Sequence, residues 1–298
     1  MIDLSIIIVT YNHQDEISDC LQTLARAICS FQSEIFIIDN HSTDQTIAIS
    51  QRLLSHFGRK HHGSIICNET NKGFTQAVNQ GLLQSQGELV LILNPDTELS
   101  PDIFSSLTEI FKNNRNVGIV SPQFRNPDGT IQPSVRHFPR NRDVVYNALG
   151  LSWLFSKSKE FNYWKMGDFD HQTQREVEQP QGAFLLARRE AIERVGILDE
   201  RFPMFFSDVD WCRRFIQNGW KILFVPSVQI VHHKGTSIYK NRLNMIWTSH
   251  RSFYYYFKKY YRGTFWSFIN HFTGELLLCM AILRSIFYLL NSKNIKDY

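Results

Sequence analysis

The chain has 298 residues, 43% of them hydrophobic and 20% charged, a globular balance that excludes general disorder. Its formal net charge of +4 is too small for a nucleic-acid coat, so we expect no nucleic acid among its partners. Its 5 cysteines are scattered, odd in number and without CxxC spacing, which argues against a disulfide framework or a zinc site and fits a reducing cytoplasm.

The first 120 residues alternate strand and helix patterns. Continuous apolar runs predict strands at 4–9, 34–38, 64–67 and 89–93. Apolar spacing predicts helices over 17–28 and 74–82, and start signals predict two more, after a capping box at Ser42–Gln45 and from Ser100-Pro101. This rhythm is typical of an α/β fold with a parallel sheet, whose ligands bind at the carboxyl ends of the strands.

The middle of the chain changes character. The turn sequence Asn126–Gly129 predicts a hairpin, and the aromatic, irregular residues 137–178 are expected to form loops with short helices. Further on, the pattern predicts strands at 183–187, 222–225 and 228–231, and helices at 189–195 and 208–216, the last ended by Asn218-Gly219.

Polar residues follow three of the predicted strands, as Thr10-Tyr11-Asn12, Asp39–Asp44 and Asn94-Pro95-Asp96. Because the carboxyl ends of parallel strands meet at one edge, we expect a nucleotide-sized polar crevice there. Asp39 could accept the imide N–H of a uracil or thymine ring, with an Asx turn or a helix cap as an equal alternative. Asp96 fits a loop that holds a divalent cation, with an ordinary turn before a helix as the alternative of equal weight.

Asp208 stands at the start of a predicted helix, where the macrodipole favours a carboxylate without any catalytic role. From its position alone, this structural interpretation is favoured over a catalytic one. The neighbouring Phe202, Phe205 and Phe206 would nevertheless dehydrate Asp208, raise its pKa and make it a usable general base. Asp210 could instead hold Arg213 or Arg214 on the same helix.

His232 and His233 end a predicted strand, and alternation turns only one of them inward. A lone histidine is more often structural, and His61-His62, in a glycine-flanked loop, is interpreted that way. The motifs of dinucleotide oxidoreductases (GxGxxG), P-loop NTPases (GxxxxGKS or GxxxxGKT) and nucleophile-elbow hydrolases (GxSxG) are not present. Thr10–His13 also lacks the Gly- and Arg-rich loop that a sugar-phosphate nucleotidyltransferase would need.

Seven short motifs, in order over about residues 3 to 260, together resemble glycosyltransferase family 2, and most of all its rhamnosyltransferase-like branch, which builds bacterial surface polysaccharides. The motifs are SIIIVTYN at 5–12, DNHSTD at 39–44, NKGF at 71–74, NPDTE at 94–98, QGAF at 181–184, FSDVDWCR at 206–213 and HHKGTS at 232–237. Each motif is weak alone, and seven in register are a strong signal.

The resemblance implies a GT-A fold, a mostly parallel, Rossmann-like sheet flanked by helices. It also implies an inverting transferase with a UDP- or dTDP-linked sugar donor, rhamnose being a guess from the branch, and a Mg²⁺ or Mn²⁺ cofactor. Residues 1–120 would form the nucleotide-sugar-binding half and residues 121–238 the acceptor-binding, catalytic half.

The same resemblance implies roles for individual residues. Asp208 would be the catalytic base, and Asp96 and His232 would bind the metal. The substrate-binding residues would be Thr10, Tyr11, Asn12, Asp39 and Asn40 for the base and ribose, Asn71 and Gly73 near the nucleotide, Asn94 at the first position of the metal motif, and Gln181 and Gly182 on the donor or acceptor side.

One position departs from the family pattern in a way that bears on activity. Many relatives carry Glu or Asp immediately before the base, where this chain has Ser207. We favour Asp208 as the base, because a serine hydroxyl does not accept a proton near neutral pH. The alternative hypothesis is a degenerate relative that binds nucleotide sugars without turnover.

Residues 239–298 form a basic, aromatic tail that is expected to be helical. Between Trp211 and Gly274 there are ten Lys and Arg and no Asp or Glu. The apolar run Leu276–Leu290 contains Arg284 and falls short of the roughly 20 residues that span a bilayer. We therefore expect a helix that lies peripherally on the inner face of the plasma membrane, near a saccharide or lipid-linked acceptor. Packing on the catalytic domain, or on a second subunit in a homo-oligomer, is the alternative.

Overall fold

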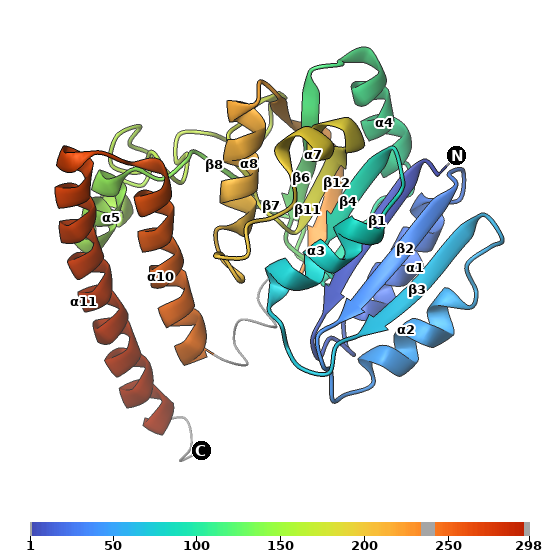
Figure 1. Ribbon diagram of the computed structural model, residues 1–298, viewed down its shortest axis with the longest axis horizontal. Helices are drawn as coiled ribbons and strands as arrows, with labels where there is room; N and C mark the ends of the chain where they lie inside the picture. The colour runs from blue at the N-terminus through green and yellow to red at the C-terminus, as the bar shows by residue number, and fades with distance from the viewer. Residues whose placement is uncertain (1, 234–241, 295–298) are drawn as a thin grey trace.

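The computed structural model describes residues 2–233 and 242–294. A mixed, mainly parallel sheet forms its centre, and two long C-terminal helices stand to one side (Figure 1). Across the sheet the strands run in the order β3 (His61–Cys67), β2 (Ser33–Asp39), β1 (Leu4–Thr10), β4 (Leu89–Leu93), β11 (Phe184–Arg188), β6 (Val117–Arg125), β12 (Lys221–His232) and β5 (Thr97–Leu99). The short strands β7 (Ile131–Gln132) and β9 (Arg175–Glu176) pair with β6 and β12, and β8 (Val135–Arg136) pairs with β10 (Gln179–Pro180).

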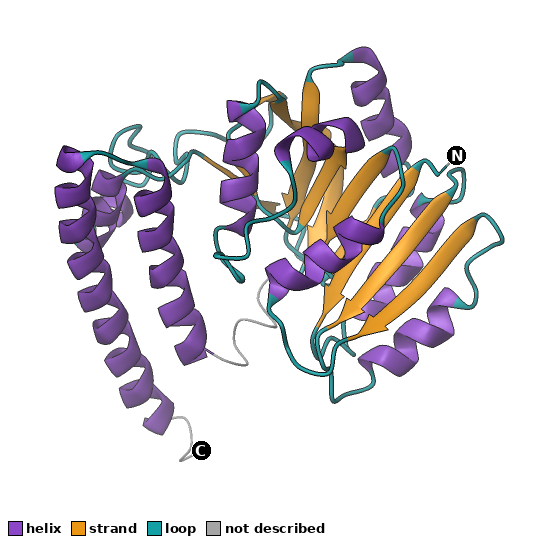
Figure 2. Cartoon of the chain, viewed as in Figure 1, coloured by secondary structure: helices purple, strands orange, loops and turns teal. Residues whose placement is uncertain are grey.

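Helices cover both faces of this sheet (Figure 2). One face is packed by α1 (Ile17–Ala27), α2 (Thr46–Leu54) and α4 (Ile103–Asn113), and the other by α3 (Phe74–Gln84), α7 (Arg189–Val195) and α8 (Ser207–Gln217). Along β1, Ile6 and Ile8 enter the first core while Ile7 and Val9 enter the second. Burial on both faces explains why the predicted strands at 4–9 and 89–93 read as continuous apolar runs.

The register of the sheet brings the predicted polar ends together. β1 pairs in parallel with β2, Thr10 opposite Asp39, and with β4, Ile8 opposite Leu93. β11 runs antiparallel to β4 with Phe184 opposite Leu93, so the residues just before β11 lie beside those just after β4. The GT-A architecture expected from the family resemblance, with its mostly parallel sheet, is confirmed.

Two predicted helix starts are wrong. The capping box at Ser42–Gln45 does not form, because the Ser42 hydroxyl donates to Asp39 and accepts from the Asn12 N–H, and α2 begins at Thr46. The helix expected from Ser100 begins at Ile103, with Asp102 at the N-cap. β5 pairs with β12 up to Leu99, so a turn must follow before the helix can start.

Two strand predictions are also corrected. His61 and His62 belong to β3, whose seven residues pair with β2 in parallel, and the His61 ring contacts the Ser33 hydroxyl, so they are not loop residues. The strands expected at 222–225 and 228–231 are one strand, β12, with a register shift between Val225 and Gln229. Such a bulge lets Pro226 sit inside a strand without a missing ladder hydrogen bond. The hairpin turn at 126–129 and the helix ended by Asn218-Gly219 are confirmed.

The irregular middle segment contains α5 (Asn141–Ala148) and α6 (Leu151–Leu154), and the tail forms α10 (Arg242–Tyr260) and α11 (Thr264–Asn294). A third core of aromatic and apolar side chains joins these helices to the loop before α8 and to α8 itself. Its buried members are Val144, Phe202, Phe206, Val209, Tyr256, Phe257 and Leu277.

A buried carboxylate reinforces that junction. Asp210 on α8 is fully buried and accepts from Arg214 Nε at 2.9 Å and from the Tyr260 hydroxyl at 2.7 Å. Lys259 contacts the same carboxylate and also Asp199, at 2.8 Å. Of the two partners that the sequence offered for Asp210, Arg214 makes the contact, whereas Arg213 donates to the Tyr256 hydroxyl.

The length argument against a membrane span does not hold for α11. Helical structure begins at Thr264, so Thr264–Leu290 is long and apolar enough to cross a bilayer by length and composition, and its most apolar window is only 17% buried. Much of its apolar surface faces outward, including Phe268, Leu283 and Phe287. Residues 234–241 lie outside the described residues. They include Lys234–Ser237, which end the last sequence motif, and Lys240, one of the ten basic residues counted between Trp211 and Gly274.

We predict that Asp210→Ala lowers the free energy of unfolding by about 3 kcal/mol, because it removes a fully buried carboxylate that accepts from the partly buried Arg214 and Lys259. Urea unfolding checks the value, with the exposed helical variant Glu109→Ala as the control. Equal stability of the two variants would contradict the assignment.

Candidate active site

A cavity of about 730 Å³ opens at the carboxyl edge of β1, β2 and β4, a size within the range of small-molecule sites. Its wall includes eight of the residues predicted from the sequence: Thr10, Tyr11, Asn12, Asn40, Asn71, Gly73, Asn94 and Asp96. Asp39, Gln181, Gly182, Asp208 and His232 are not among the lining residues that the structure describes. We call this space the donor cavity, because the family resemblance assigns nucleotide-sugar binding to these residues.

Asp39 lies behind the cavity wall. It is 1% exposed, and its two carboxylate oxygens accept from the Thr10 hydroxyl at 2.9 Å, the Ser42 N–H at 2.8 Å and the Ser42 hydroxyl. These contacts form the turn that the sequence offered as the alternative to base recognition. Asp39 thereby fixes the loop that carries Asn40 into the cavity.

Amide side chains hold the cavity's other loops in place. Asn40 Nδ2 donates to the Gly73 carbonyl at 3.1 Å, and Asn71 Oδ1 accepts from the Gly73 N–H at 2.9 Å. Gly73 has a φ of 83°, and a Cβ there would lie 3.0 Å from the Pro203 carbonyl oxygen, so only glycine fits. Asn12, also at positive φ, accepts from the Thr43 N–H through its side chain.

Asp96 and His232 form a buried pair that fits a divalent cation. Asp96 Oδ1 is buried and has no hydrogen-bond partner within residues 2–233 and 242–294. It lies 3.5 Å from His232 Nε2. An unsatisfied buried carboxylate oxygen is costly unless a cation or a proton occupies the space beside it.

The tautomer of His232 supports the same interpretation. Gln132 Nε2 donates to Asn126 Oδ1 at 2.7 Å and to the His232 carbonyl at 3.2 Å, so Gln132 Oε1 is the acceptor that faces His232 Nδ1 at 2.7 Å. The proton of the neutral ring is therefore on Nδ1, and Nε2 presents a lone pair toward Asp96. Second-sphere partners of this kind orient the histidine ligands of metal sites.

The pair alone is not a complete cation cage. Within the described ranges, no group of three or more His, Cys, Asp or Glu residues is arranged to hold a metal ion. A divalent ion at Asp96 and His232 would therefore need oxygens from a substrate diphosphate, as Mg²⁺ commonly does. Burial raises the pKa of the nearby Cys20 thiol to about 12.

Asp208 reaches the same edge from α8. Its Oδ2 accepts from the Gly182 N–H at 3.0 Å and from Gln179 Nε2 at 3.1 Å. The carbonyl of the next residue, Ala183, accepts from the Asn94 N–H at 2.9 Å, so Gly182-Ala183 links Asp208 to the Asn94–Asp96 loop. Burial raises the pKa of Asp208 above its ordinary value, outweighing the hydrogen bonds and the nearby Arg136 charge.

The backbone around Asp208 is unusual in two ways. Phe206 is buried at a φ of 71°, a left-handed conformation that a bulky residue adopts only when its surroundings impose it. A Cβ at Gly182 would lie 3.2 Å from Asp208 Cβ, so glycine permits the close approach. Ser207 is buried and donates to the Met204 carbonyl.

Sequence reasoning did not find several residues of this site. Gln132 and Gln179 orient His232 and Asp208 from positions far away in the chain, and no local pattern marks them. α10 also contributes Asn244, Met245 and Thr248 to the wall of the donor cavity, although the tail was expected to act elsewhere.

Solved structures with the same architecture identify the fold class as GT-A. A mannosyltransferase from Pyrobaculum calidifontis, solved with GDP-Man and Mn²⁺, superposes with a TM-score of 0.59 at 16% identity over 100% of this chain and 83% of that chain. TarS of S. aureus in complex with UDP-GlcNAc superposes with a TM-score of 0.52 at 16% identity, covering 83% of this chain and 66% of that one.

The chain belongs to glycosyl transferase family 2, whose family model matches residues 5–196, and it is a glycosyltransferase. It is 27% identical over 276 residues to an N-acetylglucosaminyl-diphospho-decaprenol L-rhamnosyltransferase of Mycobacterium tuberculosis, covering 87% of this chain and 85% of that protein. The resemblance found in the sequence motifs is thus confirmed at the level of the family.

We predict that Asp96→Ala, His232→Ala and Gln132→Ala each weaken Mn²⁺ binding in the presence of a nucleoside diphosphate, by roughly tenfold or more. Each change removes a ligand or the group that orients one. The free-Mn²⁺ signal in electron paramagnetic resonance measures this directly. The exposed variants Asp15→Ala and His62→Ala serve as controls, and Mn²⁺ binding unchanged in all three site variants would disprove the site.

Proposed function

We propose that this protein is an inverting, divalent-metal-dependent transferase that moves a sugar from a UDP- or dTDP-linked donor to a hydroxyl of a lipid-linked saccharide. Rhamnose is the proposed sugar. The observation that carries the proposal is the convergence of the donor cavity, the Asp96–His232 pair and the Asp208 carboxylate on one edge of the sheet.

The proposed chemistry assigns one role to each group. Asp208 accepts the proton of the acceptor hydroxyl while that oxygen attacks the anomeric carbon from the side opposite the diphosphate. The new C–O bond forms as the bond to the diphosphate oxygen breaks, which inverts the configuration. A divalent cation held by Asp96 and His232 would offset the charge of the departing diphosphate.

The donor cavity supplies positioning. Thr10, Tyr11, Asn12 and Asn40 would hold the base and ribose, and Asn71 and Gly73 would lie near the rest of the nucleotide. The amides of the cavity are already held by hydrogen bonds within the protein, so little reorganisation is needed when the donor binds.

Two observations support a lipid-linked acceptor: the name of a relative and the surface of the C-terminal helices. The mycobacterial relative's name states that it acts on an N-acetylglucosaminyl-diphospho-lipid. α11 exposes an apolar row, and the exposed Arg242 and Arg251 on α10 would face anionic headgroups. We propose that residues 239–298 hold the enzyme peripherally on the inner face of the plasma membrane, with pairing of two subunits through α11 as the competing outcome.

We predict transfer from dTDP-rhamnose or a UDP-sugar to prenyl-diphosphate-linked N-acetylglucosamine in the presence of Mn²⁺, with loss of transfer in EDTA. Product analysis by NMR gives the anomeric configuration. If the protein bound the donor but transferred sugar to no acceptor, the alternative hypothesis would be favoured. In that hypothesis, suggested by Ser207, the protein is a degenerate relative that binds nucleotide sugars without turnover.

Asp208→Asn should lower kcat by about 10²–10⁴-fold while donor affinity is kept, because only proton acceptance is lost. In the wild type, Asp208 is protonated below its raised pKa, so kcat/KM should fall as pH decreases through a value above that of an ordinary aspartate. A pH–rate profile measures this decrease of kcat/KM at acidic pH. Asn244→Ala, on the cavity wall, is the control: it should change the KM for the donor without changing the pH at which kcat/KM falls.

A further inference from the structure

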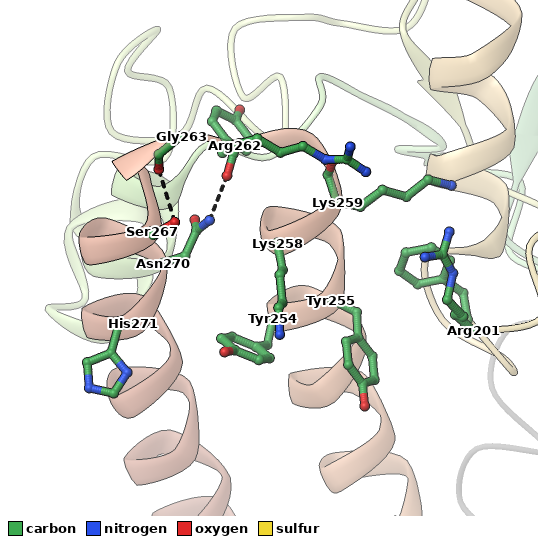
Figure 3. A pocket seen from close by; sticks show the side chains of 12 residues that line it. Arg201, Tyr254, Tyr255, Lys258, Lys259, Arg262, Gly263, Ser267, Asn270 and His271 are labelled. Carbon is green, nitrogen blue, oxygen red and sulfur yellow. Dashed lines mark hydrogen bonds between the residues drawn. The ribbon is translucent and has the colours of Figure 1, made fainter. Parts of the chain in front are cut away.

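A second cavity, of about 710 Å³, lies between α10, α11 and the loop before α8. Four cations line it, and no Asp or Glu is among its lining residues in the described part of the chain: Arg201, Lys258, Lys259 and Arg262. Figure 3 shows Lys258, Lys259 and Arg262 on the last turns of α10 and the bend after it, with Arg201 on the facing loop. We call this space the basic cavity.

Two of the four cations are available to a ligand. Arg201 and Lys259 are paired with Asp199, at 2.5 Å and 2.8 Å. Within residues 2–233 and 242–294, no carboxylate lies within ion-pair distance of Lys258 or Arg262, and both are exposed. Lys258 lies over the Tyr254 ring, and Arg262 Nε donates to the Lys259 carbonyl at 3.0 Å. Tyr254 and Tyr255 also line the cavity, whereas the hydroxyl of the lining Tyr261 donates to the Pro139 carbonyl at 3.2 Å.

A third space shares lining residues with both the basic cavity and the donor cavity. That intermediate cleft, of about 590 Å³, shares Arg201 and Tyr255 with the basic cavity. It shares Pro203, Asn244 and Thr248 with the donor cavity. The loop 201–204 therefore borders all three spaces, and it ends four residues before Asp208.

The chemistry of the intermediate cleft suits a saccharide. Trp247 is 44% exposed and presents an aromatic face, on which the apolar side of a sugar ring can pack. Glu200, Asn244 and Thr248 supply acceptors and donors for sugar hydroxyls. The cleft is less basic than its neighbour, since Glu200 also lines it.

Beyond the basic cavity begins the exposed apolar row of α11. His271 and Ser267 line the cavity, and the adjacent Phe268 and Phe272 are 76% and 62% exposed. In the order of their shared lining residues, the protein thus offers a reaction site, a polar aromatic cleft, a cationic cavity and an apolar surface. A lipid-linked saccharide has the same order of parts: hydroxyl, sugar, diphosphate and hydrocarbon chain.

We propose that the basic cavity binds the diphosphate of the lipid-linked acceptor through Lys258 and Arg262, while the intermediate cleft holds the sugar next to it. This assignment rests on the proposed function for the nature of the acceptor. Charge-assisted contacts from a lysine and an arginine are a common means of holding a diphosphate. The cavity then selects acceptors that carry a diphosphate and positions them with the sugar toward Asp208.

Binding of farnesyl diphosphate, measured by tryptophan fluorescence in detergent with EDTA, tests the proposal without turnover. The double variant Lys258→Ala/Arg262→Ala should weaken binding by roughly tenfold or more, because two charged donors are lost. The charge-preserving Lys258→Arg/Arg262→Lys should retain most of it. Lys112→Ala/Arg115→Ala, with the same charge change at the exposed end of α4, should bind like the wild type.

The remaining probes separate the sources of the anion. Farnesol should bind the wild type and the Ala double variant equally weakly. Undiminished binding of farnesyl diphosphate by the Ala double variant would overturn the proposal. The proposal would also be overturned if the Ala double variant still bound farnesyl diphosphate but no longer bound phosphatidylglycerol vesicles. The two cations would then serve the membrane surface alone.

Activity adds a test that distinguishes this inference from the proposed function. The Ala double variant should show a raised KM for the prenyl-diphosphate acceptor, with an unchanged KM for an alkyl N-acetylglucosaminide that has no phosphate. If the wild type transfers to neither acceptor, the proposed function fails, while the farnesyl diphosphate measurement still decides the role of the cavity.

Discussion

The contact between Asp96 and His232 is the feature on which the catalytic account depends most. A buried carboxylate oxygen without a partner among the described residues lies 3.5 Å from an imidazole nitrogen whose ring is oriented by Gln132. Such an arrangement is unfavourable by itself and becomes favourable when a cation joins the two atoms. The sheet imposes it, because β5 and β12 pair with Thr97 opposite His232 and so bring the two loops together.

The remainder of the site is built around that pair by long-range contacts. Asn94 binds the Ala183 carbonyl, and Gly182 binds Asp208, so the antiparallel strand β11 links the cation loop to the proposed base. On the other side, the Asp210 network fixes α10 against α8. α10 borders the donor cavity, the intermediate cleft and the basic cavity, so this network fixes one wall of all three spaces.

Local sequence signals predicted most of the fold, and they failed where distant residues intervene. The run at 89–93 is β4 because burial on both faces needs only apolar residues. Ser42 carries a correct capping pattern, yet Asn12 and Asp39 take its hydroxyl. His232 could be chosen as a ligand only from the family resemblance, because the residue that orients it, Gln132, is 100 positions away. The basic cavity has no sequence motif, because its walls come from two helices and a loop.

The most direct test of the central claim is the position of a bound cation. Crystals grown with Mn²⁺ and a nucleoside diphosphate would give an anomalous difference peak for manganese. The account predicts one peak in contact with the Asp96 carboxylate and His232 Nε2, with the diphosphate in the donor cavity as a further ligand. A nucleotide bound in the cavity with its manganese away from both side chains would contradict it.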